Sequence, residues 1–275
     1  QHPNKLARHY SRFNVAKRLL LTGHSHQAWL DCAFDGQMQA IEDAAIYVDE
    51  KWGEAFKKAQ KVKSGFARLI DDDAENLALG QNTHELVVRF LSGLPLKEKP
   101  RIVTTDGEFH SIRRQLERLE EEGVEIIRVS ASPVQDIVSK LIEQMNDRTA
   151  AVMVSSVLFQ SGLIVPGLEE LQPACGKHGT ELLVDAYHSL NVVPFSVKKL
   201  NLENSFIVGG GYKYCQLGEG NCFMRVPPDC EMRPVVTGWF AEFAQLSGEK
   251  TGGNVFYGSG AERFAGSTYD PVSHY

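Results

Sequence analysis

Asp185 and Lys213 are the two residues whose types and positions point most directly to chemistry. Asp185 ends the apolar run LLV, and Lys213 follows the next apolar run, FIV, and three glycines. A lysine amine can form a Schiff base with an aldehyde, and a carboxylate can keep a pyridine nitrogen protonated so that the ring draws electrons. The pair therefore predicts pyridoxal phosphate (PLP) as the cofactor, held by Lys213 and steadied by Asp185.

Both residues also have an ordinary interpretation. Lys213 can emerge into solvent after its strand, and Asp185 can cap the element that follows. A P-loop is excluded, because the pattern G-x-x-x-x-G-K-[ST] does not fit GGGYKY. A lysine is costly to bury without a role, which favours a functional Lys213. The glycines before it would let a ligand approach the backbone closely.

Asn82 and Thr83 stand at the start of the predicted helix HELVVRFLSG. Either residue is an ordinary N-cap. The same position also suits a phosphate, because the first N–H groups of a helix are free and the helix dipole favours an anion. We therefore predict that this turn binds the cofactor phosphate.

Other candidate residues also follow predicted strands. Phe109 is either a core aromatic or the ring that stacks on the pyridine. Ser155 and Ser156 end the run TAAVMVSS and could donate hydrogen bonds to the cofactor. His188, three residues after Asp185, is either structural or a contact of the carboxylate or the cofactor.

The elements that must position these residues alternate along the chain. Helical spacing of apolar residues predicts one long helical stretch over residues 35–70. Strands and helices then alternate, which implies βαβ units and a mainly parallel sheet covered by helices on both faces, an α/β fold with three layers. Ligands of such sheets sit at the carboxyl ends of the strands. The predicted strands are LALG, RIVTTD, VEIIRVS, TAAVMVSS, ELLVDAY and NSFIVGG.

Composition limits the class of partner and the compartment. The chain has 275 residues and a net charge of −6, which argues against a nucleic-acid partner. No apolar run approaches the roughly 20 residues that span a bilayer, and the first residues lack the apolar core of an export signal. The five cysteines show no CxxC spacing, so we expect reduced thiols, no metal site and a cytoplasmic location.

In order along the chain, these motifs resemble the class V aminotransferase group of fold-type-I PLP enzymes, and within it the kynureninases. The resemblance is sharpest in VDAYHS, in GGGYKYCQLGEGNCF, and in the pair GWFAEF and ERFAGST. It implies a sheet of the seven-stranded type found in the large domain of PLP-dependent transferases. It also implies hydrolytic cleavage of the Cβ–Cγ bond of kynurenine-type substrates to alanine and an anthranilate.

The resemblance implies a role for each candidate residue. Lys213 would form the Schiff base and move protons at the substrate α-carbon, with Tyr212 as a proton donor. Asp185 would pair with the pyridine nitrogen beside His188. Implied cofactor contacts are Tyr212, Thr83, the backbone near Asn82, the stacking ring of Phe109, Ser155, and Trp239 and Thr268, with Trp239 reaching over from the second subunit of a homodimer.

Three departures from the kynureninase pattern bear on the substrate and on domain organisation. The N-terminal motif GNSLG reads GHSHQ here, which makes His24 and Ser25 candidate substrate contacts, and the pattern Phe-x-x-Asp ends in Ile112. The chain stops at Tyr275, before the small C-terminal domain of the family. We expect an N-terminal arm over residues 1–35, a PLP-binding domain over residues 36–275, and a small domain missing from this sequence.

Two alternatives to a kynureninase remain open. One is a class V aminotransferase, or a carbon–sulfur lyase of the cysteine desulfurase type. Desulfurases need a nucleophilic cysteine on a mobile loop well after the lysine, and Cys215, Cys222 and Cys230 lie too close to Lys213 for that role. The other alternative is a non-catalytic scaffold, which would have no use for Lys213 or Asp185.

Overall fold

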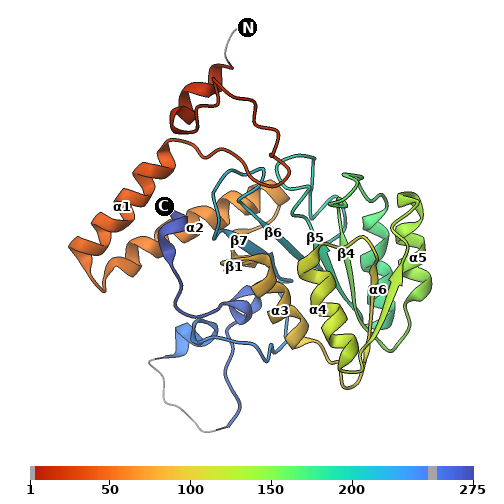
Figure 1. Ribbon diagram of the computed structural model, residues 1–275. Coiled ribbons are helices and arrows are strands. Elements are labelled where there is room, and N and C mark those ends of the chain that lie inside the picture. Colours follow the sequence, from red (N-terminus) through yellow and green to blue (C-terminus); the bar gives the residue numbers. More distant parts are fainter. Residues whose placement is uncertain (1–3, 247–252) are drawn as a thin grey trace.

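A seven-stranded sheet forms the centre of the computed structural model, which describes residues 4–246 and 253–275 (Figure 1). The strand order is β1-β7-β6-β5-β4-β2-β3. All neighbouring strands are parallel except β7, which runs antiparallel to both β1 and β6. The strands are β1 (Leu77–Gly80), β2 (Arg101–Thr105), β3 (Glu125–Val129), β4 (Thr149–Ser155), β5 (Glu181–Asp185), β6 (Phe206–Gly210) and β7 (Cys222–Arg225).

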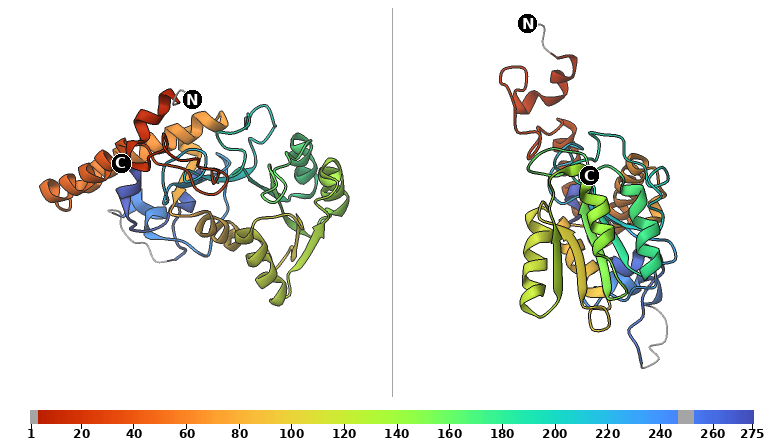
Figure 2. Two further views of the ribbon diagram at one scale, coloured as in Figure 1. Left: turned by 45° about the horizontal axis from the view of Figure 1, so that its top comes forward. Right: turned by 90° about the vertical axis from the view of Figure 1, so that its right-hand side faces the viewer.

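Helices cover both faces of the sheet, as the alternating sequence pattern predicts. Apolar residues of α2, α5 and α6 pack on one face, and those of α3 and α4 pack on the other. The right-hand view of Figure 2 shows the sheet between these layers. This three-layer, mainly parallel arrangement confirms the predicted fold class. The α-helices are α1 (Cys32–Tyr47), α2 (Lys51–Ile70), α3 (Thr83–Gly93), α4 (His110–Glu121), α5 (Ile137–Gln144) and α6 (Leu171–His178).

Shorter 3-10 helices lie before, between and after these elements. They are η1 (Lys5–Phe13), η2 (Ala74–Asn76), η3 (Val134–Asp136), η4 (Leu168–Glu170), η5 (Trp239–Gln245), η6 (Gly260–Phe264) and η7 (Pro271–His274). Buried Ala261 and Phe264 of η6 join the α3–α4 side of the core. The C-terminal segment therefore packs against the same domain as the sheet.

The prediction of one helical stretch over residues 35–70 was wrong in one respect. The chain turns between α1 and α2, where Val48 adopts a positive φ of 52°. An unbroken helix of that length would extend about 54 Å, well beyond the sheet. The turn lets α1 contact α2, while α2 buries Phe66 and Ile70 in the core (Figure 1).

The carboxyl ends of β4 and β5 place two candidate residues side by side. Ser155 pairs with Asp185 in the parallel register, and Asp185 pairs with Val208 of β6. The apolar residues before Asp185 are fully buried between the helical layers. A sheet held in this way fixes the polar residues at its edge, where ligands of α/β sheets bind.

The glycines at the end of β6 leave room for side chains of the protein itself. A Cβ on Gly210 would lie 2.4 Å from the Tyr187 hydroxyl oxygen, and one on Gly211 would lie 2.7 Å from a methyl carbon of Leu217. Larger residues would displace these neighbours. Gly210 and Gly211 therefore have a packing role, and close approach of a ligand to this backbone stays a prediction.

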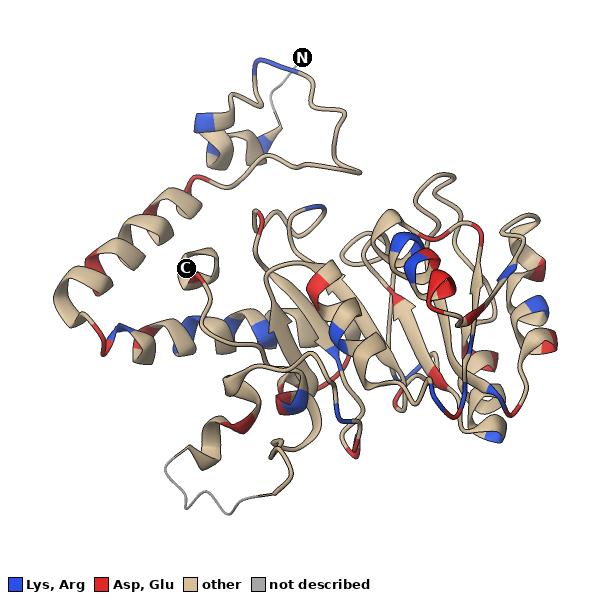
Figure 3. Cartoon of the chain, turned by 60° about the horizontal axis from the view of Figure 1, so that its bottom comes forward, with Lys and Arg blue, Asp and Glu red and all other residues tan. Residues whose placement is uncertain are grey.

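Charges of both signs are interspersed along the helices (Figure 3). None of the described helices is long and apolar enough to cross a membrane. Among residues 4–246 and 253–275, no three His, Cys, Asp or Glu side chains gather as a metal site would require.

Candidate active site

A cavity of about 260 Å³ opens at the carboxyl edge of the sheet. It brings together eight predicted site residues from five separate segments. These are Asn82, Thr83, Phe109, Ser155, Asp185, His188, Tyr212 and Lys213. Further lining residues include His84, Ser111, Phe159, Tyr187, Glu219 and Cys222.

Lys213 is buried in this cavity, with 5% of its surface exposed. Its Nζ lies 2.7 Å from Nε2 of His188. Burial lowers the pKa of Lys213, although the charge of Asp185 opposes that shift. Burial, together with the Lys213 charge, lowers the pKa of His188 to about 4. His188 is therefore neutral at neutral pH, and its Nε2 is within hydrogen-bond distance of the Lys213 amine.

Asp185 is buried on the same wall of the cavity. One carboxylate oxygen accepts the backbone N–H of Tyr187 at 2.8 Å. Burial raises the pKa of Asp185 to about 6, against the smaller opposing effects of that N–H and of Lys213. A carboxylate with so few partners is prepared for a cationic or protonated ligand.

The start of α3 lines the cavity with Asn82, Thr83 and His84. The Asn82 side chain caps the helix by accepting the N–H of Glu85 at 2.9 Å. A helix leaves its first N–H groups without intrahelical partners. The Thr83 N–H is directed to the Cys222 sulfur, so the N–H of His84 is the one available to an anion. The Thr83 hydroxyl lies 3.8 Å from the Cys222 sulfur and lines the same wall.

Three aromatic rings surround the Lys213 amine. Its Nζ is 5.0 Å from the centre of the Tyr187 ring, 5.2 Å from that of Phe109 and 5.6 Å from that of Tyr212. Burial raises the pKa of Tyr212, so its hydroxyl is protonated at neutral pH. The arrangement suits stacking by Phe109 and proton donation by Tyr212.

Glu108 is a residue of this region that sequence reasoning missed. Its carboxyl is buried beneath the cavity and accepts hydrogen bonds from Thr105 and from Ser155. Burial raises the pKa of Glu108 to about 7, and the Asp185 charge adds to the effect. An acidic residue in the loop after a predicted strand, next to Phe109, was the available signal.

The N-terminal segment reaches the rim of the cavity. The ring of His26 lies 5.6 Å from that of Tyr212, and its Nε2 is 4.0 Å from a carboxylate oxygen of Glu219. The Ser25 hydroxyl oxygen lies 2.8 Å from Nδ1 of its neighbour His26. The charge of His24 contributes to the lowered pKa of His188. His24 and Ser25 therefore lie close to the cavity without lining it.

Trp239 and Thr268 do not line the Lys213 cavity within the described part of this chain. Trp239 is 43% exposed and packs on Phe240 and Phe243, with ring centres 4.4 and 5.4 Å away. Thr268 is exposed in the segment after η6. Their predicted contacts with the cofactor are not made within one copy of the described chain.

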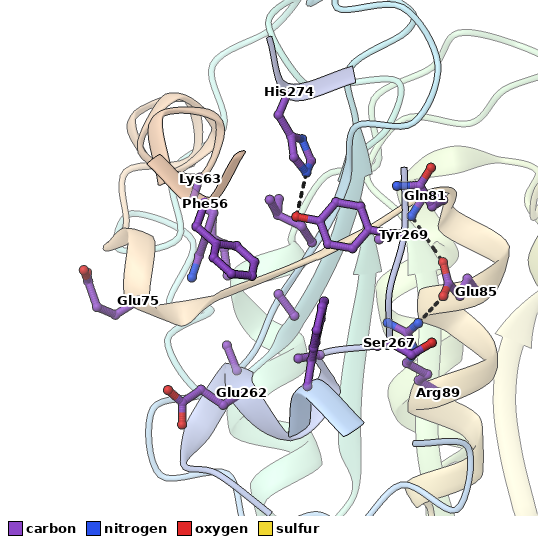
Figure 4. Close-up of a pocket in the computed structure, with 18 residues that line it drawn as sticks. Phe56, Lys63, Glu75, Gln81, Glu85, Arg89, Glu262, Ser267, Tyr269 and His274 are labelled. Atoms are coloured by element: carbon purple, nitrogen blue, oxygen red, sulfur yellow. Dashed lines mark hydrogen bonds and ion pairs between the residues drawn. The ribbon is translucent and has the colours of Figure 1, made fainter. Parts of the chain in front are cut away.

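A second cavity, of about 270 Å³, adjoins the first, and the Gln81 side chain lines both (Figure 4). It holds the half-buried Lys63, whose pKa is lowered by burial, and the buried Arg89, which pairs with Glu85. Its three aromatic residues are Phe56, Phe240 and Tyr269. The carboxylates whose charges act on Lys63 are those of Glu75 in η2 and Glu262 in η6, and neither ends a strand as Asp185 does.

Solved structures of PLP-containing proteins share this fold. A variant of the cystine C–S lyase C-DES, with glycine covalently linked to its PLP cofactor, matches with a TM-score of 0.81 and 18% identity. The match covers 99% of this chain and 71% of that protein. C-DES in complex with cysteine persulfide matches with a TM-score of 0.78 over 92% of this chain and 68% of that protein, at 19% identity. At this identity the likeness establishes the fold.

Curated relatives carry several different activities. An uncharacterized aminotransferase, YcbU, of Bacillus subtilis is 25% identical over 86% of this chain and 62% of its own length. The mitochondrial cysteine desulfurase of Candida albicans is 24% identical over 71% of this chain and 40% of its own length. The kynureninase of Bacillus cereus is 22% identical, with 78% of this chain and 49% of that protein covered.

The family itself is clear. The chain spans between 40 and 62% of the length of these three relatives. Kynureninase is a distant relative, and desulfurases and other class V enzymes are at least as similar, so the family is supported more broadly than the kynureninase motifs suggested. The model of the family described as aminotransferase class-V matches residues 48–237, more than half of the chain. The chain belongs to the class V aminotransferase family.

Proposed function

We propose that this chain binds PLP and is the cofactor-binding domain of an enzyme that acts on an amino acid. The observation that carries the proposal is that Lys213 and Asp185, from different segments, line one cavity together with the start of α3. PLP, when bound, supplies an electron sink for reactions at the substrate α-carbon. Retention of both residues argues against the scaffold alternative.

The donor set of the cavity fits PLP. The ring needs a stacking face and a carboxylate at its nitrogen, and Phe109 and Asp185 provide them. The aldehyde needs an uncharged amine, which the lowered pKa of Lys213 favours. The phosphate needs donors, and the start of α3 supplies the N–H group of His84, with the Thr83 hydroxyl on the same wall of the cavity. The volume of about 260 Å³ approaches the lower limit of small-molecule pockets.

The residues of the cavity would act on protons at defined atoms. Lys213 Nζ would take the proton from the substrate α-carbon, and neutral His188 would orient that amine through the 2.7 Å contact. Asp185 would hold the proton of the pyridine nitrogen. Tyr212 would donate its hydroxyl proton to the departing group, since its raised pKa keeps it protonated.

The bond that is broken is proposed to be a carbon–sulfur bond of a cystine-type or cysteine-type substrate. The fold likeness to C-DES covers nearly the whole chain. Burial raises the pKa of Cys215 to about 11 and also raises that of Cys222, so neither thiol is a ready nucleophile. A lyase that releases sulfur without a nucleophilic protein thiol is consistent with these residues.

Kynureninase activity is the second candidate, because the GWF and YKY motifs and the Bacillus cereus relative support it. Incubation of the PLP-treated protein with cystine, with kynurenine and with an amino acid plus 2-oxoglutarate separates the candidates. Release of persulfide or sulfide supports the lyase, and release of anthranilate supports kynureninase. Amino transfer alone would contradict both.

The pKa of Asp185 leads to a prediction about stability and cofactor affinity. The pKa is raised from its ordinary value of 3.8 to about 6. The native state therefore binds more protons than the unfolded state between these values, and the stability contribution falls as pH rises through that window. Asp185→Asn should stabilise the cofactor-free protein by about 1 to 3 kcal/mol above pH ~7, and by nothing below pH ~4. The same variant should bind PLP more weakly.

Chemical denaturation at both pH values and a PLP titration measure these effects. Asp106→Asn is the matched control, because Asp106 is an exposed carboxylate at the same edge that accepts one backbone N–H. The control should change neither quantity. A destabilised Asp185→Asn protein with normal PLP affinity would contradict the assigned role.

The remaining predicted contacts are proposed to come from a second copy of the chain. Trp239 and Phe243 expose 43% and 49% of their surfaces, side by side on η5. A homodimer that covers this patch would let Trp239 and Thr268 reach the partner's PLP phosphate. In the same proposal the arm of residues 1–35, which meets Tyr212 through His26, borders the substrate.

Mixing two inactive variants tests whether the active site is shared between two copies of the chain. Trp239→Ala and Lys213→Ala copies should each be inactive alone, and co-refolded mixtures should recover part of the activity in mixed dimers. Sedimentation confirms the assembly. Recovery should fail if each site is complete within one copy.

A cytoplasmic location remains a prediction, and all five cysteines are unpaired in the structure.

A further inference from the structure

Glu108 has an asymmetric set of hydrogen-bond partners. Its Oε1 accepts the Thr105 hydroxyl at 2.7 Å and the Ser155 backbone N–H at 3.2 Å. Its Oε2 accepts the Ser155 hydroxyl at 2.6 Å. The residue is 3% exposed, so these contacts are made away from bulk water.

The asymmetry decides where a proton would bind. Both acceptor positions of Oε1 are taken, whereas Oε2 has one partner. A proton on Glu108 therefore resides on Oε2, in the short contact with the Ser155 oxygen. Ser155 must donate to the ionised carboxylate, but it can accept from the protonated one.

Ser155 lines the cavity, so this reversal changes what the cavity offers. With Glu108 ionised, the Ser155 proton is committed to Oε2, and the hydroxyl presents lone pairs to a ligand. With Glu108 protonated, the Ser155 proton is free to turn into the cavity. The same hydroxyl is then a donor.

The charges around Glu108 make both states accessible. Burial raises its pKa to about 7, with a contribution from the charge of Asp185 at the end of β5. Lys213, past the end of β6, acts on Asp185. The nearby titratable residues Asp106, in the same loop, and His110, at the start of α4, are exposed. Thr105 of β2 and Ser155 of β4, which contact Glu108, carry no charge.

We propose that Glu108 is a positioning residue that switches Ser155 between hydrogen-bond acceptor and donor toward the cofactor. The inference rests on the proposed binding of PLP. It assigns the pH response of the site to a residue that need not touch the cofactor.

Glu108→Gln distinguishes the two states. The glutamine oxygen replaces Oε1, which has two donors, and its NH₂ replaces Oε2 and donates to Ser155. The variant therefore imitates the protonated carboxyl at every pH. The absorbance spectrum of the PLP-loaded wild type should change with a midpoint near pH 7, in line with the pKa of Glu108. Glu108→Gln should keep the low-pH spectrum throughout.

Two further variants test the hydrogen bond between Glu108 and Ser155. Ser155→Ala should also lose the spectral transition, because the hydroxyl that carries it is gone, and it keeps the proposal testable if Glu108→Gln does not fold. Glu143→Gln, at an exposed position of α5, is the matched control and should behave as the wild type. Infrared spectra of the cofactor-free protein should show a carboxylic-acid band that Glu108→Gln lacks and Ser155→Ala retains.

The failures are distinguishable. A wild type that forms no cofactor band overturns the proposed function and this inference with it. A normal cofactor band whose pH transition persists in Glu108→Gln or Ser155→Ala overturns the role of Glu108 alone.

Discussion

Lys213→Ala is expected to abolish the cofactor band that borohydride treatment would otherwise fix, and to lower activity by at least about 10²-fold. The buried amine is the group that would bond to the PLP aldehyde and then move the substrate proton. Its lowered pKa, caused by burial, favours the uncharged form that both tasks require. Absorbance spectra before and after borohydride, with product assays, measure both effects.

Lys63→Ala is the matched control for this variant. Lys63 is half-buried, shares with Lys213 a pKa lowered by burial, and lines the neighbouring cavity (Figure 4). Its loss should leave the band and the activity unchanged. If Lys213→Ala kept the band while Lys63→Ala lost it, the cofactor would have to be placed in the other cavity.

Arg225→Met is expected to lower the free energy of unfolding by about 3 to 5 kcal/mol, the usual cost of leaving a buried charge unpaired. The Arg225 and Asp72 side chains are only 2% and 8% exposed, and their atoms Nε and Oδ2 are 2.6 Å apart. The same guanidinium donates to the carbonyl oxygens of Glu203 and Ser205. It thereby ties β7 to the turn after α2 and to the loop before β6.

Denaturant unfolding measures this loss. Adding Asp72→Asn should recover part of it, because the unpaired carboxylate is removed. Arg128→Met is the control, since Arg128 pairs with Glu120 at the surface and should cost no more than about 1 kcal/mol. A loss of that small size for Arg225→Met would show that the buried pair does not hold β7.

The sequence predicted most of the sheet, because each strand is an apolar run bounded by polar or glycine residues. It also predicted which side chains meet at the carboxyl edge, since parallel strands end on the same side. The cavity contains Asp185, Lys213, Thr83 and Phe109 together. These residues could be predicted because each lies at the end of a strand, just after a strand, or at the start of a helix.

Other features depend on neighbours that are distant in the sequence. Glu108 gains its role from Ser155, and that contact requires β2 and β4 to be adjacent, an order that strand patterns alone do not reveal. The turn at Val48 depends on how α1 packs on α2. The short β7 run, CFMR, was not separated from the lysine loop, because its antiparallel pairing with β1 and β6 is set by the fold.

The motifs also suggested a narrower function than the comparisons support. The YKY motif contains Lys213, and the GWF motif contains Trp239 of the exposed aromatic patch. Neither motif by itself defines the substrate. The N-terminal histidines near Tyr212 differ from the kynureninase pattern. Substrate choice is therefore expected to depend on this arm.

The central claim is that Lys213 carries the cofactor. The most direct test is to treat the folded, PLP-supplemented protein with borohydride and map the phosphopyridoxyl group by peptide mass spectrometry. The proposed function predicts one modified peptide, with the group on Lys213. A folded protein that carries no such group, or carries it on Lys63 or on surface lysines as often as on Lys213, would contradict the proposed function.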